Sequence, residues 1–181
     1  MPRAERTVIA IDHALRAWVV AHRIVVFNPL MWALSAVGRG GMIWLALAAV
    51  LAERRRLRVF ALVQLALALL LTTAVADYAI KPMVDRARPF AVSRDVQVIG
   101  GRPSDASFPS GHAANAFAGA LVLSVATVEP TAIWWLLAVA IAFSRVYLGV
   151  HYPLDVLGGA VVGAACAAVV LRFVQRPEIT T

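Results

Sequence analysis

The stretch AFSRVYLGVHYPLDVLG, residues 142–158, decides how the rest of the chain is interpreted. It places Arg145, His151 and Asp155 within an otherwise apolar region. Charged groups in such surroundings are costly and usually have a functional role. His151 and Asp155 are four residues apart across Pro153, a residue type that can open a helix. The carboxylate can therefore accept a hydrogen bond from Nδ1 of the imidazole and leave Nε2 free to act as a nucleophile.

The composition of the whole chain indicates an integral membrane protein. Of the 181 residues, 61% are hydrophobic, and the mean hydropathy is +0.79. These values are too high for an ordinary soluble domain. The net charge of +7 does not indicate a nucleic-acid partner, because many basic residues lie in short loops beside apolar runs, where they determine topology. The other basic residues gather near the histidines, so membrane lipids and anionic phosphate groups are the expected partners.

The pattern of apolar segments predicts an all-α, polytopic membrane bundle with five to six transmembrane helices in a single domain, residues 1–181. Residues 1–28 are expected to hold an N-terminal amphipathic helix that lies at the membrane interface, with a tilted sixth span as the alternative. Gly159 and Gly163 form a GxxxG pattern that predicts close helix packing. The segments long enough to be predicted as spans are 30–52, 59–80, 111–128, 132–148 and 154–173.

Basic residues at the ends of these segments predict the orientation of the chain. The cluster at 53–58, together with Arg172 and Arg176, indicates a cytoplasmic side that includes the C-terminus. Counting spans from this side puts the loop 81–110 and three groups of polar residues on the opposite side. The sequence therefore predicts an inner-membrane protein with an active site on the extracytoplasmic side, where the loop contributes to the site.

The first polar group is KPMVDRARP, residues 81–89. Lys81 and Arg88 are two helical turns apart and can hold phosphoryl oxygens, the arginine through its fork and the lysine as a point charge. The alternative is a basic belt that contacts lipid headgroups. Asp77 precedes Lys81 by four residues, so it could orient the ammonium group or form a plain interfacial ion pair.

The second polar group is FPSGHAAN, residues 108–115. Ser110 and Gly111 open a predicted span, so their backbone N–H groups are expected to cradle a phosphate. His112 could donate a proton to a leaving oxygen. The alternative is a capped helix start with an incidental histidine. Arg39, within the first predicted span, could bind a second phosphate or headgroup, or could be a residue that snorkels to the boundary.

The third polar group is SRVYLGVHYPLD, residues 144–155, which contains Arg145, His151 and Asp155. The alternative to a catalytic role is an ion pair between His151 and Asp155 that only helps to seat the helix. Together the three groups resemble the three motifs of the type 2 phosphatidic acid phosphatase superfamily, K-x6-RP, PSGH and SR-x5-H-x3-D. The match is complete at every defining position across residues 81–155. This superfamily includes membrane lipid phosphatases, polyprenyl diphosphate phosphatases, soluble acid phosphatases and vanadium haloperoxidases. The small helical bundle resembles the bacterial membrane members.

The resemblance implies a role for each matching residue. His151 would attack phosphorus and form a phosphohistidine, Asp155 would orient His151, and His112 would protonate the leaving group. The charge on the phosphoryl group would be stabilised by Lys81, Arg88, Arg145 and the N–H groups of Ser110 and Gly111. No cofactor and no metal are expected, because three cations can replace Mg²⁺ and the nearby carboxylates (Asp77, Asp85, Asp105 and Asp155) are scattered in sequence.

The expected function is hydrolysis of the terminal phosphate of a lipid phosphate or diphosphate, with undecaprenyl or another polyprenyl diphosphate favoured. Phosphatidic acid and phosphatidylglycerol phosphate fit the same chemistry. Arg94 and Arg102 in the long loop could contact a second phosphate. The rival from another class is a non-catalytic bundle that binds or transports lipid phosphates. A haloperoxidase-like use of vanadate is disfavoured by the membrane setting.

Overall fold

The computed structural model describes residues 3–93 and 96–174, and these residues form helices and connections without any strand. Two residues used in the sequence-based predictions, Arg94 and Arg176, lie outside the described ranges. The helices are α1 (Arg3–Ala21), α2 (Asn28–Val37), α3 (Met42–Glu53), α4 (Val59–Thr73), α5 (Lys81–Val84), α6 (Pro89–Val92), α7 (Gly111–Ala126), α8 (Thr131–Tyr147) and α9 (Pro153–Phe173). A π-helical stretch, Ala74–Ile80, joins α4 to α5, and short 3-10 turns cover Val25–Phe27 and Arg39–Gly41.

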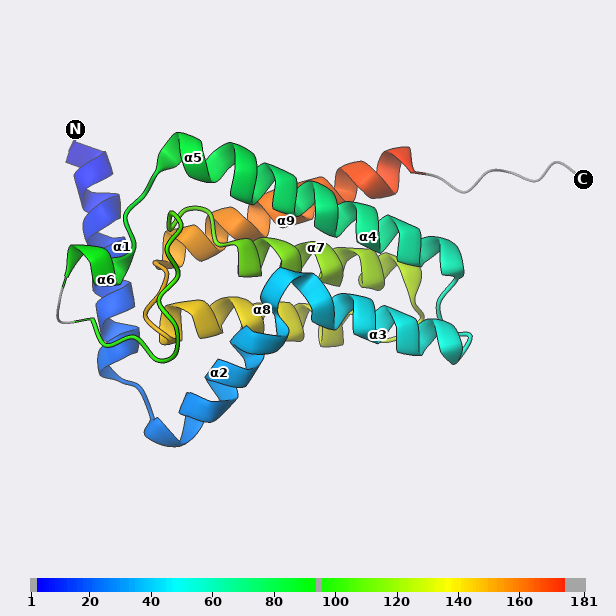
Figure 1. The fold of residues 1–181 in the computed structure, drawn as a ribbon, viewed down its shortest axis with the longest axis horizontal. Helices are drawn as coiled ribbons and strands as arrows, with labels where there is room; N and C mark the ends of the chain where they lie inside the picture. Colours follow the sequence, from blue (N-terminus) through cyan, green and yellow to red (C-terminus); the bar gives the residue numbers. More distant parts are fainter. Residues whose placement is uncertain (1–2, 94–95, 175–181) are drawn as a thin grey trace, which may run out of the picture.

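Helix α7 forms the centre of the bundle and packs against α4, α8 and α9 (Figure 1). Six of its nine buried residues are alanine or glycine, so its neighbours approach closely. Larger side chains from the surrounding helices fill the core, among them Trp44, Leu65 and Ile141, all fully buried. Trp44 packs directly over Gly119, where a Cβ atom would lie 2.3 Å from the indole ring.

The outer surface of the bundle exposes many large apolar side chains. Leu70, Leu136 and Val161 expose about two thirds of their surface. Large apolar side chains on several helices are exposed in the same way, which is the arrangement expected when lipid surrounds the protein. The all-α fold class predicted from the sequence is confirmed, and the apolar exterior supports an integral membrane protein.

The predicted number of spans is not confirmed by helix length. Within the described ranges, two stretches are long and apolar enough to cross a bilayer by themselves, Val59–Val92 and Pro153–Phe173. Helices α7 and α8 have 16 and 17 residues. At 1.5 Å per residue each is somewhat shorter than the roughly 30 Å hydrocarbon core. The count of five to six therefore stays a prediction.

The predicted first span, 30–52, is divided into two helices. Gly40 and Gly41 adopt left-handed backbone angles, with φ of 59° and 74°, and these angles end α2 before α3 begins. Figure 1 shows the two helices meeting at a sharp angle. The break falls at residues 38–41, which contain three glycines and so allow a turn that an apolar helix would not make.

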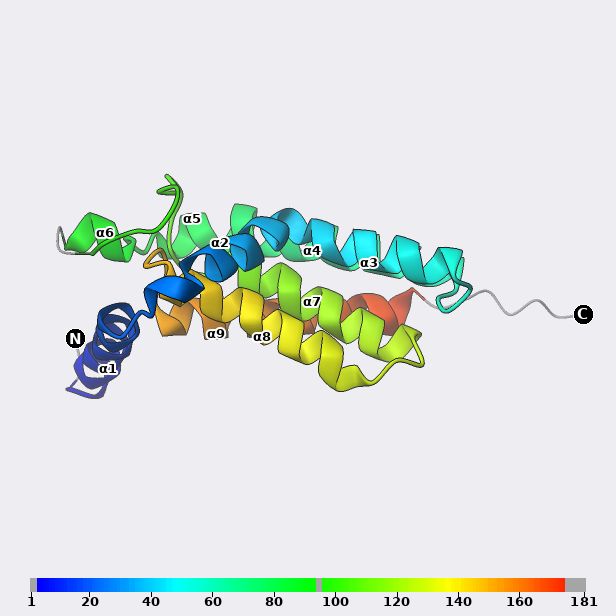
Figure 2. The same ribbon diagram turned by 90° about the horizontal axis from the view of Figure 1, so that it is seen from below.

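Helix α1 crosses the end of the bundle at a steep angle to α7, α8 and α9 (Figures 1 and 2). A bend of 96° separates it from the segment that contains α2. Arg23, in the connection after α1, holds this bend against the rest of the protein. Its Nε donates to the carbonyl of Tyr147 (2.6 Å), and its Nη1 donates to the carbonyl of Gln97 (2.7 Å). Ile11, Leu15 and Trp18 are each at least half exposed. This orientation agrees with the predicted interfacial helix, which remains a proposal because no membrane is present.

The predicted GxxxG contact is present between α9 and α7. A Cβ atom at Gly163 would lie 1.9 Å from the carbonyl oxygen of Ala114, and one at Gly159 would lie 2.4 Å from that of Ser110. Both obstacles are backbone atoms, which cannot rotate away. The two glycines therefore determine how closely α9 approaches the start of α7.

We expect Gly163→Ala to lower the free energy of unfolding by about 3 kcal/mol, the upper end of the cost of overpacking, because the new methyl group must push two helices apart. The midpoint of thermal unfolding in detergent measures the effect, and a loss of several degrees is expected. Gly101→Ala is the matched control, since nothing lies within 4 Å of a Cβ atom there. Equal midpoints for the two variants would contradict this packing argument.

Candidate active site

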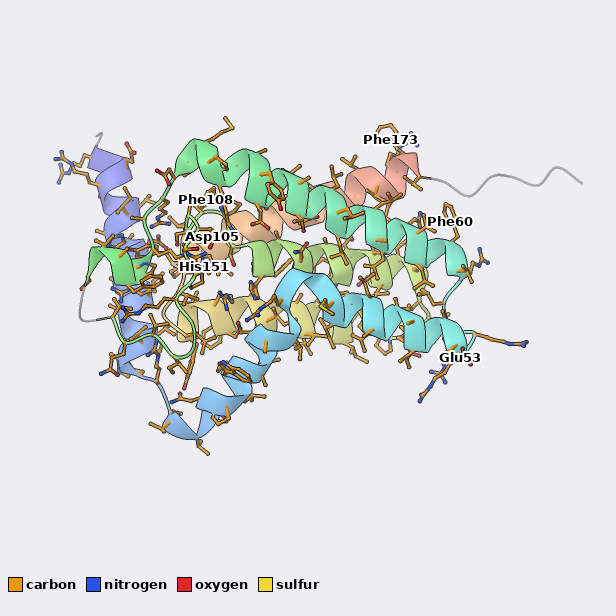
Figure 3. All side chains as sticks on the ribbon, viewed as in Figure 1. Glu53, Phe60, Asp105, Phe108, His151 and Phe173 are labelled. Atoms are coloured by element: carbon orange, nitrogen blue, oxygen red, sulfur yellow. The ribbon has the colours of Figure 1, made fainter. Side chains whose placement is uncertain are left out.

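The residues predicted from the three sequence groups meet at one end of the bundle, beside α1. A cavity of about 240 Å³ lies there. Its lining includes most of the candidate site residues named in the sequence analysis, namely Arg39, Asp77, Lys81, Arg88, Gly111, His112, Arg145 and His151. Figure 3 shows Asp105 and His151 close together at this end, far from Glu53 and Phe173.

Each candidate side chain lies at the end of a helix or in the connection next to one. Lys81 begins α5, and Arg88 directly precedes α6, whose first residue is a proline. His112 lies in the first turn of α7, and Arg145 lies in the last turn of α8. His151 lies in the connection between α8 and α9. Helix ends leave backbone groups without intrahelical partners, so this end of the bundle is polar although the helices themselves are apolar.

The two nitrogens of His151 have different neighbours. Nε2 lies 3.2 Å from Nη1 of Arg88, which can only donate, so Nε2 carries the lone pair. The proton is then on Nδ1, which lies 3.4 Å from Oδ2 of Asp155 and makes no hydrogen bond within the described ranges. The imidazole is 2% exposed. The sequence-predicted pair is therefore adjacent, and Nε2 faces the cations.

The charge state of His151 follows from its surroundings. Burial lowers the pKa of this imidazole, and the positive charges of Arg88 and Arg145 lower it further. The adjacent carboxylate of Asp155 raises it in part, and the resulting pKa is about 4. His151 is therefore neutral at physiological pH, as a nitrogen nucleophile must be.

Asp105 is a site residue that the sequence analysis did not select. Its carboxylate binds both cations of the first group: Oδ1 accepts from Nη2 of Arg88 at 2.8 Å, and Oδ2 accepts from Nζ of Lys81. Burial raises the pKa of Asp105, but the hydrogen bonds and charges of Lys81 and Arg88 outweigh it and lower the pKa to about 2. The carboxylate thus occupies the cationic sites that a phosphate would use.

Lys81 also contacts Asp77, as the spacing of four residues predicted. The distance from Nζ to Oδ1 of Asp77 is 2.6 Å. The same carboxylate lies beside Gly111, where a Cβ atom would come within 2.9 Å of Oδ1. Asp77 therefore forms the predicted ion pair and also lies against the start of α7.

Arg145 is the least compensated of the three buried cations. Its Nη1 donates to Oγ of Ser35 on α2, and its Nε has no hydrogen-bond partner within the described ranges. The residue is 7% exposed, and no carboxylate of the described chain lies within 4 Å of its guanidinium nitrogens. A buried guanidinium in this state favours binding of an anion.

The structure contradicts one donor of the predicted phosphate cradle, the N–H of Ser110. The backbone N–H of Ser110 donates to the carbonyl oxygen of Asp155 at 2.9 Å, so this donor is used to join α7 to α9. Its hydroxyl accepts from the N–H of Ala113 as the N-cap of α7. The open first turn of α7 leaves the N–H groups of Gly111 and His112 as the cradle candidates.

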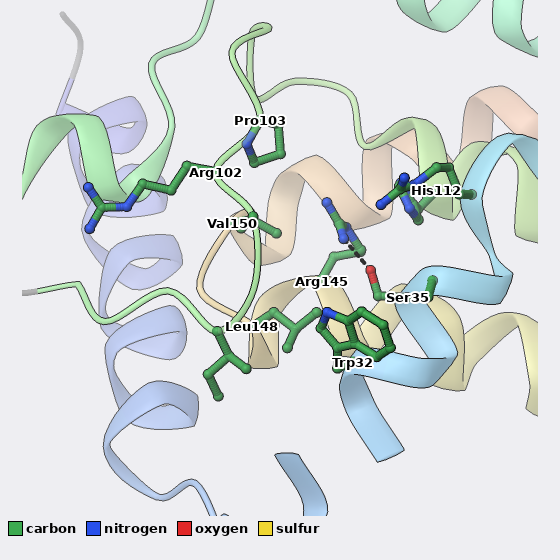
Figure 4. Close-up of a pocket in the computed structure, with 12 residues that line it drawn as sticks. Trp32, Ser35, Arg102, Pro103, His112, Arg145, Leu148 and Val150 are labelled. Atoms are coloured by element: carbon green, nitrogen blue, oxygen red, sulfur yellow. Dashed lines mark hydrogen bonds between the residues drawn. The ribbon is translucent and has the colours of Figure 1, made fainter. Parts of the chain in front are cut away.

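A second cavity of about 400 Å³ adjoins the first (Figure 4). His112 and Arg145 line both cavities, as does Arg39. Figure 4 shows Arg145 against Ser35, with Trp32 beneath them and Arg102 on the loop above. Arg39, exposed at the break between α2 and α3, is thus placed where it could contact the remainder of a bound phosphate ester.

Among the residues that the structure describes, carboxylates and imidazoles do not gather as they would at a metal centre. Within residues 3–93 and 96–174, no group of three or more His, Cys, Asp and Glu side chains is arranged to hold a metal ion. The carboxylates near the site instead pair with Lys81, Arg86 and Arg88.

Comparison with known proteins identifies relatives of this chain. The family model of the PAP2 superfamily matches residues 58–178. The undecaprenyl-diphosphatase of Sulfolobus acidocaldarius is 32% identical over 148 residues, which cover 79% of this chain and 68% of that protein. In the alignment with the decaprenylphosphoryl-5-phosphoribose phosphatase of Mycobacterium tuberculosis, the matched region is 43% identical and covers 50% of this chain and 49% of the relative.

Two solved structures share the fold. The crystal structure of Aquifex aeolicus LpxE superposes with a TM-score of 0.76 at 30% identity, covering 88% of this chain and 94% of that one. The transmembrane PAP2-type phosphatidylglycerolphosphate phosphatase of Bacillus subtilis superposes with a TM-score of 0.71 at 26% identity, covering 97% and 90%.

If Asp105 and phosphate compete for Lys81 and Arg88, Asp105→Asn should tighten the binding of inorganic phosphate by about threefold to tenfold. The amide leaves both cations less compensated, and the gain is modest because the Asp105 side chain is half exposed. Titration calorimetry on the detergent-purified protein measures the dissociation constant. Asp85→Asn, at an exposed carboxylate in the connection between α5 and α6, is the control with equal charge change. Unchanged or weaker binding in Asp105→Asn alone would contradict the competition.

Proposed function

The chain belongs to the PAP2 superfamily, and from this premise we propose that it hydrolyses the terminal phosphate of a lipid diphosphate. The observation that carries the proposal is the geometry around His151. A neutral imidazole presents Nε2 to a cavity lined by three buried cations, while its other nitrogen faces a buried carboxylate. Phosphoryl transfer needs this combination of a positioned nucleophile and stabilisation of negative charge.

In the proposed first step, Nε2 of His151 attacks phosphorus as the bond to the leaving oxygen breaks. Lys81, Arg88 and Arg145 stabilise the charge on the phosphoryl oxygens, with the N–H groups of Gly111 and His112. The His112 side chain, protonated at the start of the step, donates its proton to the bridging oxygen, which leaves with the lipid monophosphate. Asp155 stabilises the positive charge that develops on the His151 ring as its Nε2 bonds to phosphorus.

In the proposed second step, His112 takes a proton from a water molecule whose oxygen then attacks the phosphohistidine. The bond between phosphorus and Nε2 breaks, and inorganic phosphate leaves with His151 neutral again. The cations supply the charge stabilisation that Mg²⁺ supplies in many phosphoryl-transfer enzymes. The proposed reaction therefore needs no metal and no cofactor.

Two features support a polyprenyl diphosphate as the substrate. The adjoining cavity contains Arg39 and, on the loop, Arg102, so a second phosphate could bind beside the reacting one. The Sulfolobus relative is an undecaprenyl-diphosphatase. Phosphatidylglycerol phosphate is the alternative, supported by the likeness to the phosphatidylglycerolphosphate phosphatase of Bacillus subtilis. In either case the apolar tail would lie against the exposed apolar faces of the helices.

The proposed placement of the site is extracytoplasmic, with the C-terminus in the cytoplasm. It rests on the basic cluster at 53–58, which lies at the end of the bundle opposite His151. In the same proposal the whole chain is one domain, residues 1–28 lie on the membrane and residues 81–110 form the outer loop of the site. Labelling of Ser104→Cys by a membrane-impermeant thiol reagent in intact cells tests the orientation, and protection would contradict it.

The decisive experiment measures phosphate release by detergent-purified protein from undecaprenyl diphosphate, phosphatidylglycerol phosphate and phosphatidic acid, all in EDTA. We expect the diphosphate to be the best substrate. His151→Ala should lose at least about 10³-fold in kcat, because without the nucleophile no covalent intermediate forms. His22→Ala, an exposed histidine just after α1, should keep wild-type activity.

Equal turnover by His151→Ala and wild type would remove the phosphohistidine mechanism. Binding of lipid phosphates without release of phosphate would favour a non-catalytic binding or transport protein. Activity that EDTA abolishes and Mg²⁺ restores would contradict the metal-free proposal.

The lowered pKa of His151 predicts where activity fails on the acid side. Because the nucleophile must be unprotonated, a pKa of about 4 keeps it active at pH values at which an ordinary imidazole, with a pKa of about 6.5, would be protonated. The acid limb of kcat/KM assigned to His151 should therefore lie below about pH 5.5. Titration of its ring proton by NMR, identified by loss of the signal in His151→Ala, separates this limb from ionisation of the substrate. A midpoint near the ordinary imidazole value would contradict the prediction.

A further inference from the structure

A buried aspartate on α1 lies next to the proposed catalytic pair. Asp12 is 2% exposed, although its helix presents mainly exposed residues. Its Oδ1 accepts from the backbone N–H of Leu154 at 2.8 Å, in the first turn of α9, and its Oδ2 pairs with Nη2 of Arg86 at 2.5 Å. Burying a carboxylate in this way is costly unless its partners are well placed.

Arg86 connects this aspartate to Asp155. Its Nη2 binds Asp12, and its Nη1 binds Oδ1 of Asp155 at 2.7 Å. The guanidinium also lies 4.1 Å from the centre of the Tyr152 ring, which stacks on His13 of α1 at 4.6 Å. The plane of the guanidinium is therefore held from three directions. We call Asp12, Arg86 and Asp155 the carboxylate–arginine bridge.

The bridge helps to hold the plane of the Asp155 carboxylate relative to His151. Arg86 binds Oδ1, while Oδ2 accepts from Ser107 Oγ at 2.5 Å and from the N–H of Tyr152 at 2.9 Å. The same Oδ2 lies 3.4 Å from Nδ1 of His151. Turning the carboxylate out of this plane would break these contacts. Arg86 therefore contributes, with Ser107 and the Tyr152 N–H, to the orientation of the carboxylate toward the nucleophile.

We propose that Asp12 and Arg86 are positioning residues for the phosphoryl-transfer reaction, and that α1 is thereby a working part of the active site. The proposal rests on the proposed function. It extends the site beyond residues 58–178, the part of the chain that the family model matches. Asp12 acts through Arg86 and Asp155 and touches neither the substrate nor the nucleophile.

The charge of the bridge gives it a specific effect on the rate. The bridge carries two negative charges and one positive charge, so its net charge balances the positive charge that develops on His151 during attack. Loss of the Asp12 charge leaves Arg86 compensated by Asp155 alone, which weakens the attraction of Asp155 for the developing imidazolium. Lys81 and Arg145 have no contact with Asp12 or Arg86 among the described interactions, so phosphate binding should change little.

The test measures kcat and KM for the best lipid substrate, and the inhibition constant of inorganic phosphate, in Asp12→Asn. Asparagine keeps the size of the side chain and an oxygen that can accept from Leu154, but it removes the charge that Arg86 binds. We expect kcat to fall about tenfold to a hundredfold, with KM and the inhibition constant within about twofold of wild type. Glu5→Gln, which removes an exposed charge from the same helix, should have wild-type kcat.

A double variant tests whether Asp12 acts through Arg86. If it does, adding Asp12→Asn to Arg86→Gln should lower kcat less than about twofold further, because the connection is already broken. Arg86→Lys keeps the charge, but a single ammonium cannot hold both carboxylates as the guanidinium fork does. Arg86→Lys should therefore show the same selective loss of kcat. If Asp12→Asn does not fold, Arg86→Lys is measured in its place.

Wild-type kcat in a folded Asp12→Asn or Arg86→Lys protein would overturn the proposal. So would a loss that appears equally in Glu5→Gln, or one that raises KM and the phosphate inhibition constant as much as it lowers kcat. Failure of the proposed function would look different, because wild-type protein itself would then release no phosphate, or His151→Ala would be as active as wild type.

Discussion

The structure depends on how three buried cations are balanced at the end of an apolar bundle. Lys81, Arg88 and Arg145 are each less than 10% exposed, and an isolated charge in such surroundings would be prohibitively costly. Asp77 and Asp105 compensate the first two. Arg145 has a serine hydroxyl for one nitrogen and no partner for Nε within the described ranges. The site is thus assembled so that an added anion completes its charge balance.

Such a cluster needs a rigid frame, and the frame consists of small residues. Gly159 and Gly163 bring α9 against the backbone of α7, and the Ser110 N–H joins that helix to the carbonyl of Asp155. His112 lies in the first turn of α7, and His151 lies in the connection just before α9. The two histidines therefore have little freedom to move relative to each other. Tight packing beside the cavity thus limits the geometry within it.

The N-terminal helix adds a second level of support from outside the bundle. Its sequence has the amphipathic pattern of a membrane-surface helix, and most of its side chains are exposed. Yet Asp12 is buried against the start of α9, and Arg23 holds the connection between α8 and α9 near Gly149. A helix with this amphipathic pattern can thus also support the loop that carries the proposed nucleophile.

The sequence by itself determined the fold class, the family and the motif residues, because these depend on hydropathy, local spacing and residue type. The spacing of four residues between Asp77 and Lys81, for example, already predicts their ion pair. Only the tertiary structure decided three contacts. Asp105 lies between Lys81 and Arg88, the N–H of Ser110 donates to the carbonyl of Asp155, and Asp12 reaches α9. These contacts join residues 24, 45 and 142 positions apart, and nothing in the local pattern records them. They arise because the folded bundle brings distant polar groups into one buried volume, where each must find a partner.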